Sequence, residues 1–184
     1  MKWRIALAGA RPDAALHWAT NFFGRYDTSL VEWLHLNQGQ RRYQGVYGRC
    51  FYPTKTRPMF RISCFLPGPF PCDITTRQKP LYAQPDGTFP APPSGFRRGV
   101  LCYDPRSGRK WYRLIGATRV RNLDEAVVWI VAHEAFHFLR FTRQIPGRNN
   151  EIEADRFADR QLELFRTAAW GMAPIGQAAL VGVQ

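Results

Sequence analysis

Apolar and polar residues follow different patterns in the two parts of this chain, and the change falls near residue 122. Beyond it, apolar residues recur at helical spacing and predict two helices. The first runs from Asn122 or Asp124 to about Arg143, and the second from about Asn150 to Trp170. Because the first is apolar over most of its surface, we expect it to be buried. The second carries one apolar stripe, made of Ala154, Phe157, Ala158, Leu162 and Phe165.

Before residue 122 the predicted elements are shorter and more varied. Residues 13–23 and 28–36 have helical periodicity, and residues 46–52 and 59–66 are typical of strands. Residues 100–115 predict a hairpin, because the turn residues Asp104 to Gly108 separate two apolar runs. The first ten residues predict a strand or short helix, since their apolar stretch is too short for a secretory signal. Ten of the 14 prolines fall between Pro53 and Pro93, and residues 68–99 predict a long irregular loop.

Strands followed by a pair of helices indicate an α+β fold. The 184 residues suffice for a single domain, with a sheet-bearing portion over 1–122, a helical hairpin over 123–170 and a tail over 171–184. No apolar run reaches the roughly 18–20 residues needed to span a bilayer, so we expect no membrane association and a cytoplasmic protein. The four cysteines form no CxxC pair, and in a reducing cytosol we expect partly buried free thiols.

The net charge of +12 is unevenly distributed. Residues 1–122 hold 20 Lys and Arg against 6 Asp and Glu, whereas residues 123–184 hold 6 Arg against 8 Asp and Glu. The basic portion therefore favours an anionic partner such as nucleic acid, an acidic protein or a membrane surface, or a protein that is itself bound to DNA. Singly, the pairs Arg41-Arg42 and Arg97-Arg98 are typical of solvated surface.

His133-Glu134-Ala135-Phe136-His137 is an HExxH motif within the predicted buried helix. Residues four apart lie on one helix face, so His133 and His137 can bind one cation, and Zn²⁺ suits such nitrogen ligands. Glu134 would lie beside the ion, where it can deprotonate a zinc-bound water. The alternative is that both histidines are core residues and Glu134 is solvated. Iron or manganese could replace zinc.

A third ligand must be of another type, since no histidine follows His137. If the two helices fold back as a hairpin, Glu151 completes a His-His-Glu site and leaves one position for water. Asp155, one turn further, would accept the outward N–H of a ligand histidine, most simply His133. Glu153 is an alternative ligand, but only Glu151 stands four residues before Asp155. His17 and His35 lie beside tryptophans and are expected to pack rather than bind metal.

The segment from HEAFH to NEIEADRFAD resembles the gluzincin clan of zinc metallopeptidases. EIEADRFA is similar both to the ImmA/IrrE-like peptidases and to the integral-membrane prenyl-protein peptidases, and the absence of a predicted membrane span favours the soluble ImmA/IrrE-like group. The resemblance covers residues 123–165. It implies a small zincin-like metallopeptidase domain with an active-site helix, a second ligand-bearing helix and a short twisted sheet. By the same resemblance, His133, His137 and Glu151 are zinc ligands, Glu134 is the general base and Asp155 supports a ligand.

Two departures from the family pattern concern function. Phe136 replaces the small residue common in such motifs, and no transition-state histidine follows His137. A Tyr or Arg from the N-terminal portion would then stabilise the oxyanion.

Two functions are compatible with these features. The first is a zinc-dependent endopeptidase (a hydrolase), intracellular and regulatory or phage-related, with an edge strand over residues 112–120 that pairs with a protein or peptide substrate. The alternative is a nucleic-acid or polyanion-binding module with a structural or degenerate zinc site. A combination is a peptidase recruited to DNA-bound substrates, as in SprT-like enzymes.

Overall fold

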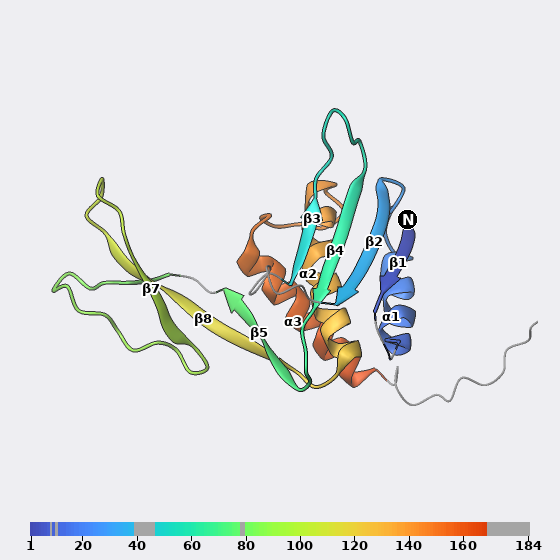
Figure 1. Ribbon diagram of the computed structural model, residues 1–184. Coiled ribbons are helices and arrows are strands. Elements are labelled where there is room, and N and C mark those ends of the chain that lie inside the picture. The colour runs from blue at the N-terminus through green and yellow to red at the C-terminus, as the bar shows by residue number, and fades with distance from the viewer. Residues whose placement is uncertain (8, 10, 39–46, 78–79, 169–184) are drawn as a thin grey trace, which may run out of the picture.

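The computed structural model describes residues 1–7, 9, 11–38, 47–77 and 80–168 as three helices and two four-stranded sheets, an α+β arrangement (Figure 1). The predicted tail, the Arg41-Arg42 pair and the predicted helix end at Trp170 lie outside these residues. Within the described ranges, no helix is long and apolar enough to cross a membrane.

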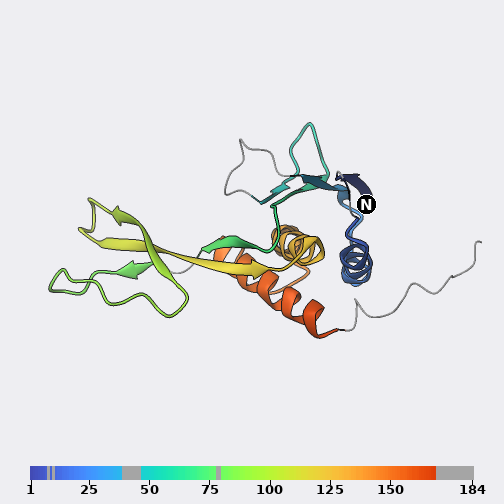
Figure 2. The same ribbon diagram turned by 60° about the horizontal axis from the view of Figure 1, so that its bottom comes forward.

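The first sheet has the order β1-β2-β4-β3. Its strands are β1 (Lys2–Ala6), β2 (Val31–Gln38), β4 (Phe60–Leu66) and β3 (Gly48–Phe51), of which only β3 is antiparallel to its neighbour. The helices lie against one face of this sheet (Figure 2). β3 forms one edge of the sheet and packs against α2 (Leu123–Phe141), the predicted buried helix.

The helix predicted over residues 28–36 is wrong, because this segment contributes the strand β2. Leu34 and Leu36 are fully buried, while Trp33 and His35, which alternate with them, are only partly buried, so burial alternates with the period of a strand. Both edges of β2 are paired in parallel, with β1 and β4. These hydrogen bonds to distant strands stabilise the strand conformation over the helix that the local periodicity favours.

The second sheet is built around the long strand β8 (Lys110–Val120). β5 (Cys72–Arg77), β6 (Leu81–Tyr82) and β7 (Arg97–Tyr103) all pair with β8 antiparallel. The predicted hairpin is confirmed as β7 and β8, whose turn closes through the Asp104 N–H to the Arg109 carbonyl. Both views show the outer part of this sheet projecting away from the helices as an arm (Figures 1 and 2).

Two expectations about this region are wrong. Residues 68–99 are not wholly irregular, because β5 and β6 form between the prolines and pair with β8. The β-branched residues of β5, with Ile74 and Thr76 buried, suit a strand even between Pro71 and Pro80. The second, an edge strand over residues 112–120, fails over 112–115, where β7 pairs with β8 opposite β6 and β5; among the described strands residues 116–120 pair with β5 alone.

The helices begin largely where the sequence places them. α1 (Asp13–Phe23) matches its prediction, and of the two candidates it is Asn122 that caps α2, by accepting the Glu125 N–H. Asp124 instead accepts the Ala15 N–H in the first turn of α1. α3 (Glu151–Thr167) is capped by Asn150 and ends a few residues before Trp170, because Ala168 has extended dihedrals.

All residues of α2 from Glu125 to Leu139 are buried, as its apolar surface predicts. The helix lies between the first sheet and α3, and α1 packs beside it (Figure 2). This central position fixes the HExxH side chains, which lie at the middle of the helix. The apolar stripe of α3 faces α2 with four of its five members buried, and Phe165 packs at the margin of the core.

Candidate metal centre

Three of the predicted residues converge between α2 and α3. Nε2 of His133 lies 3.5 Å from Oε2 of Glu151, and Nε2 of His137 lies 3.6 Å from Oε1 of the same carboxylate. One potential ligand atom from each residue lies within 4.8 Å of the other two. Within the described residues this is the one group of three or more His, Cys, Asp or Glu side chains with such spacing.

The outward nitrogens of both histidines face protein acceptors. Nδ1 of His133 lies 3.0 Å from Oδ1 of Asp155, the contact that the spacing of α3 predicts. Nδ1 of His137 lies 2.7 Å from Oδ1 of Asn149. Nδ1 of His137 is hydrogen-bonded, and Nδ1 of His133 lies within ion-pair distance of its carboxylate. A neutral imidazole with its hydrogen on Nδ1 presents its Nε2 lone pair toward Glu151, which is the tautomer that a metal ligand needs.

Asn149 is a residue that sequence reasoning missed, and it brings a second residue with it. Its Nδ2 donates to the hydroxyl of Tyr52 at 3.0 Å, so the amide is oriented from both ends. Tyr52 follows β3 directly, and its ring packs against Phe60 and Phe141. Asn149 lies in the turn between α2 and α3, where nothing but its closeness to Glu151 in the chain could have drawn attention to it.

Glu134 lies in a tight recess between α2 and β3. Its carboxylate accepts the backbone N–H of Cys50, and a Cβ placed on Gly48 would lie 2.4 Å from its Oε1. A side chain at position 48 would therefore displace the Glu134 carboxylate, a constraint that the packing of β3 on α2 imposes. Burial raises the pKa of Glu134 to about 7, although positive charge on His133 and the Cys50 N–H oppose this shift.

The two histidines have opposite pKa shifts in the absence of a metal. Burial lowers the pKa of His133, but Asp155 and Glu151 outweigh it and raise the value to about 9. For His137 burial prevails, so its pKa falls below the usual value despite the bond to Asn149. The difference follows from the partners: a carboxylate stabilises imidazolium, whereas a neutral amide oxygen does so weakly.

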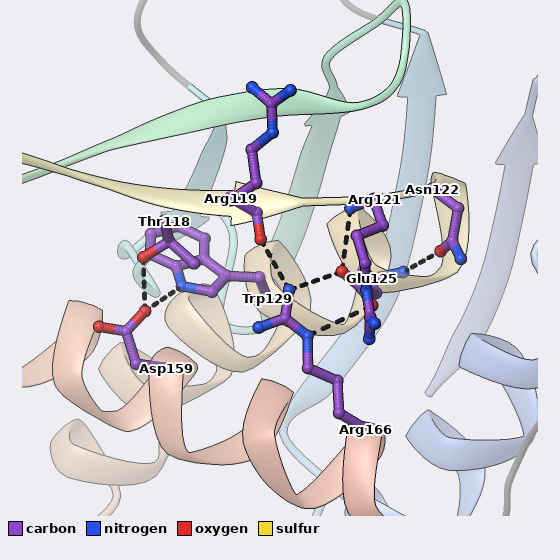
Figure 3. A network of polar contacts seen from close by, with 8 residues as sticks. All are labelled: Thr118, Arg119, Arg121, Asn122, Glu125, Trp129, Asp159 and Arg166. Carbon is purple, nitrogen blue, oxygen red and sulfur yellow. Dashed lines mark hydrogen bonds and ion pairs between the residues drawn. The ribbon is translucent and has the colours of Figure 1, made fainter.

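A tryptophan supports the site from the preceding turn of α2. Trp129 stacks on His133 with ring centroids 5.4 Å apart, and its Nε1 donates to Oδ1 of Asp159 on α3 at 2.8 Å. The same oxygen accepts the hydroxyl of Thr118 on β8 at 2.7 Å (Figure 3). Trp129 and His133 are four residues apart, as are Asp155 and Asp159, which is the spacing of the motif itself. This spacing is the one sequence signal that could have revealed Trp129 and Asp159.

The remaining candidates lie elsewhere. Glu153, the alternative ligand, bonds Arg156 at 3.0 Å instead of turning toward the histidines. His35 packs its ring edge-on against Trp33, as expected, whereas His17 is exposed on α1 and bonds Asn21. The four cysteines are free thiols, with Cys64 buried and the other three partly buried.

The site is thus a cluster of two histidines and a carboxylate, with a buried glutamate beside it and an oriented partner behind each imidazole. No family model, curated protein or solved structure matches this chain.

Proposed function

We propose that this protein is a zinc-dependent endopeptidase of zincin-like architecture, as the resemblance of its HExxH and ExxAD segments implies. The observation that carries the proposal is the convergence of His133, His137 and Glu151, with ligand atoms within 4.8 Å of one another, next to the buried carboxylate of Glu134. A structural zinc site would use four protein ligands. Here three converge among the described residues, which favours a catalytic role.

The donor set fits zinc. In a tetrahedral site with bonds of about 2.0–2.1 Å, ligand atoms stand roughly 3.4 Å apart. The distances of 3.5 and 3.6 Å between the imidazoles and the Glu151 carboxylate are close to this separation. A zinc ion held there would polarise a substrate carbonyl and lower the pKa of water.

Glu134 is the proton carrier in this mechanism. Its carboxylate takes a proton from the attacking water and delivers it to the leaving amine, so one residue serves as base and then as acid. Contact with Gly48 and the Cys50 N–H holds the carboxylate in one place, which reduces the reorganisation that catalysis needs. Asp155 and Asn149 hold the imidazoles in the ligating tautomer.

Tyr52 is our candidate for stabilising the oxyanion. Its hydroxyl accepts the Asn149 amide and so has its own proton available for a developing negative charge at the site. β3 replaces residues 112–120 as the strand that would pair with an extended peptide, because it forms the edge of its sheet and contacts Glu134.

The decisive experiment compares Glu134→Gln with Glu163→Gln, which changes an exposed glutamate on α3. With an unfolded protein substrate and cleavage read by mass spectrometry, Glu134→Gln should retain zinc and lose roughly 10²–10⁴-fold in rate. Glu163→Gln should behave as wild type. Tyr52→Phe should lower kcat and leave zinc content unchanged. Zinc-dependent cleavage that survives in Glu134→Gln would refute the proposal.

A further inference from the structure

The arm formed by β6, β7 and β8 carries a surface that the metal centre does not use. Register places Tyr82 opposite Trp111 and Arg97 opposite Ile115, so these residues share one face of the sheet with Arg113, which lies between Trp111 and Ile115 on β8. Arg109 directly precedes β8 and lines the same hollow as Tyr82. We define the arm face as Tyr82, Arg97, Arg109, Trp111 and Arg113. It consists of two aromatic rings and three cations, with no acidic member.

The aromatic rings of this face are accessible. Tyr82 is 50% exposed and lies with its ring centroid 6.1 Å from that of Trp111, which is itself only partly buried. Beside Tyr82 lies a hollow bounded by Gly87 and Gly108 from two turns and by Arg109. A ring at the edge of a hollow offers a planar surface on which another ring can stack.

The cations are also exposed, and within the described part of the chain Arg97, Arg109 and Arg113 form no ion pair. The acidic residues nearest in sequence are occupied in their own turns. Asp104 accepts the Ser107 hydroxyl and the Arg106 N–H, and these bonds, together with the nearby charge of Arg109, lower the pKa of its carboxyl. Asp86 accepts the Thr88 hydroxyl and N–H. The opposite face of the arm differs. There the Arg98 side chain donates to the Phe89 and Pro90 carbonyls and lies over the Tyr112 ring, so this arginine has protein partners as well as solvent.

From this arrangement we propose that the arm face binds single-stranded nucleic acid. Arginines would contact successive phosphates, and bases would stack on Tyr82 and Trp111, the combination by which single strands are bound without sequence preference. The arm projects away from the helices in both views, so a strand can pass along it without meeting the metal centre (Figures 1 and 2). An acidic protein would satisfy the charges but would leave the rings without a stacking partner.

The test measures binding of a fluorescent oligothymidylate to the full chain at several salt concentrations. Arg109→Ala/Arg113→Ala removes two charges from the arm face, and the matched control Lys55→Ala/Arg57→Ala removes two exposed charges from the β3–β4 loop. The first variant should lose at least about tenfold in affinity, and its log–log salt slope should fall by about 1.4, or 0.7 for each phosphate contact. The control should stay within about twofold of wild type.

Stacking is tested by Tyr82→Ala and Tyr82→Phe. We expect Tyr82→Ala to weaken binding by roughly five- to a hundredfold, and Tyr82→Phe to keep it, because the ring and not the hydroxyl contacts the base. Unchanged melting temperatures would show that the half-exposed side chain is dispensable for folding. Glu134→Gln should bind the oligonucleotide as wild type does. The binding measurements can therefore be interpreted even if the peptidase proposal fails.

Three outcomes would overturn the inference. The first is no binding of the oligothymidylate even at low salt. The second is equal loss of affinity in both double variants, which would indicate attraction by overall charge. The third is binding of polyglutamate as tight as that of the oligonucleotide, which would indicate an acidic protein partner instead.

Discussion

Polar side chains are buried and paired in the helical hairpin α2–α3, whereas they are exposed on the arm. In the hairpin, His133, Glu134 and Asp155 are buried among apolar residues and each has a partner. On the arm, arginines and aromatic rings are exposed on a thin sheet. Burying charged or titratable groups costs free energy unless they are paired or bind an ion. The hairpin therefore specifies one geometry for a small ligand, whereas the arm presents a surface that a polymer can approach.

The two regions are joined by a polar network at the base of the arm (Figure 3). Asp159 accepts bonds from Trp129 on α2 and Thr118 on β8, and Arg166 on α3 donates to Glu125 and to the Arg119 carbonyl. β8 is thereby fixed to both site helices. The predictions below test whether the difference between the hairpin and the arm holds.

The largest expected effect is on metal content. His137→Ala should reduce zinc from about one ion per chain to almost none, because two remaining ligands hold zinc poorly. His35→Ala removes a histidine that packs on Trp33 and should leave zinc unchanged. Elemental analysis of the purified proteins measures both. Stoichiometric zinc in His137→Ala would place the metal elsewhere.

The next largest effect is on the free energy of unfolding, which should respond to side-chain loss in the hairpin much more than in the arm. Phe138 is fully buried on α2, so Phe138→Ala should lower the free energy of unfolding by about 3–5 kcal/mol. Leu101 on β7 is 50% exposed, and Leu101→Ala should cost no more than about 0.5 kcal/mol. Denaturant unfolding followed by circular dichroism gives both values. Similar losses for the two variants would mean that the arm belongs to the cooperative core.

A pH-dependent effect is expected at the base of the arm. The Glu125 side chain is 3% exposed; burial alone would raise its pKa, but bonds from Arg166 and Arg121 outweigh this and hold the pKa below its usual value of 4.5. Its stabilising contribution is therefore complete above about pH 4.5 and is lost as the pH falls through the lowered pKa.

Glu125→Gln should accordingly cost about 2–3 kcal/mol at pH 7, since charge-assisted bonds are replaced by neutral ones. The difference from wild type should shrink as the pH falls toward 3, as followed by thermal melts between pH 3 and 7. A constant difference over this range would show that Glu125 acts through packing and not through its charge.

The smallest effect concerns the orientation of His137. Asn149→Ala removes the acceptor of its Nδ1–H and should weaken zinc binding by about 10–100-fold, measured by competition with a chelator. Asn149→Asp should restore affinity, because a carboxylate also accepts this hydrogen. Asn21→Ala, at an exposed amide on α1, serves as the control. If Asn149→Ala binds zinc as wild type does, the amide does not position the ligand.

The local elements were largely predictable. The helices α1, α2 and α3, the β7–β8 hairpin and the strands β3 and β4 follow from periodicity, capping residues and turns. The exceptions are β2, β5 and β6, whose strand conformation depends on partners far away in the chain. Trp33 and Leu34 belong to a strand because β1 and β4 pair with that segment, and no pattern within ten residues reveals this.

For the site, the chain order alone determined that His133 and His137 share a helix face and that Glu151 and Asp155 stand one turn apart on the next helix. Helical spacing is a local property, so the sequence carries it. Tertiary structure decided the rest: that Glu134 lies against Gly48, that Asn149 and Tyr52 lie behind His137, and that Arg109 and Trp111 stand on an arm. Those relations join segments that only packing and strand pairing bring together, because contact between distant residues depends on the whole fold and not on their neighbours in sequence.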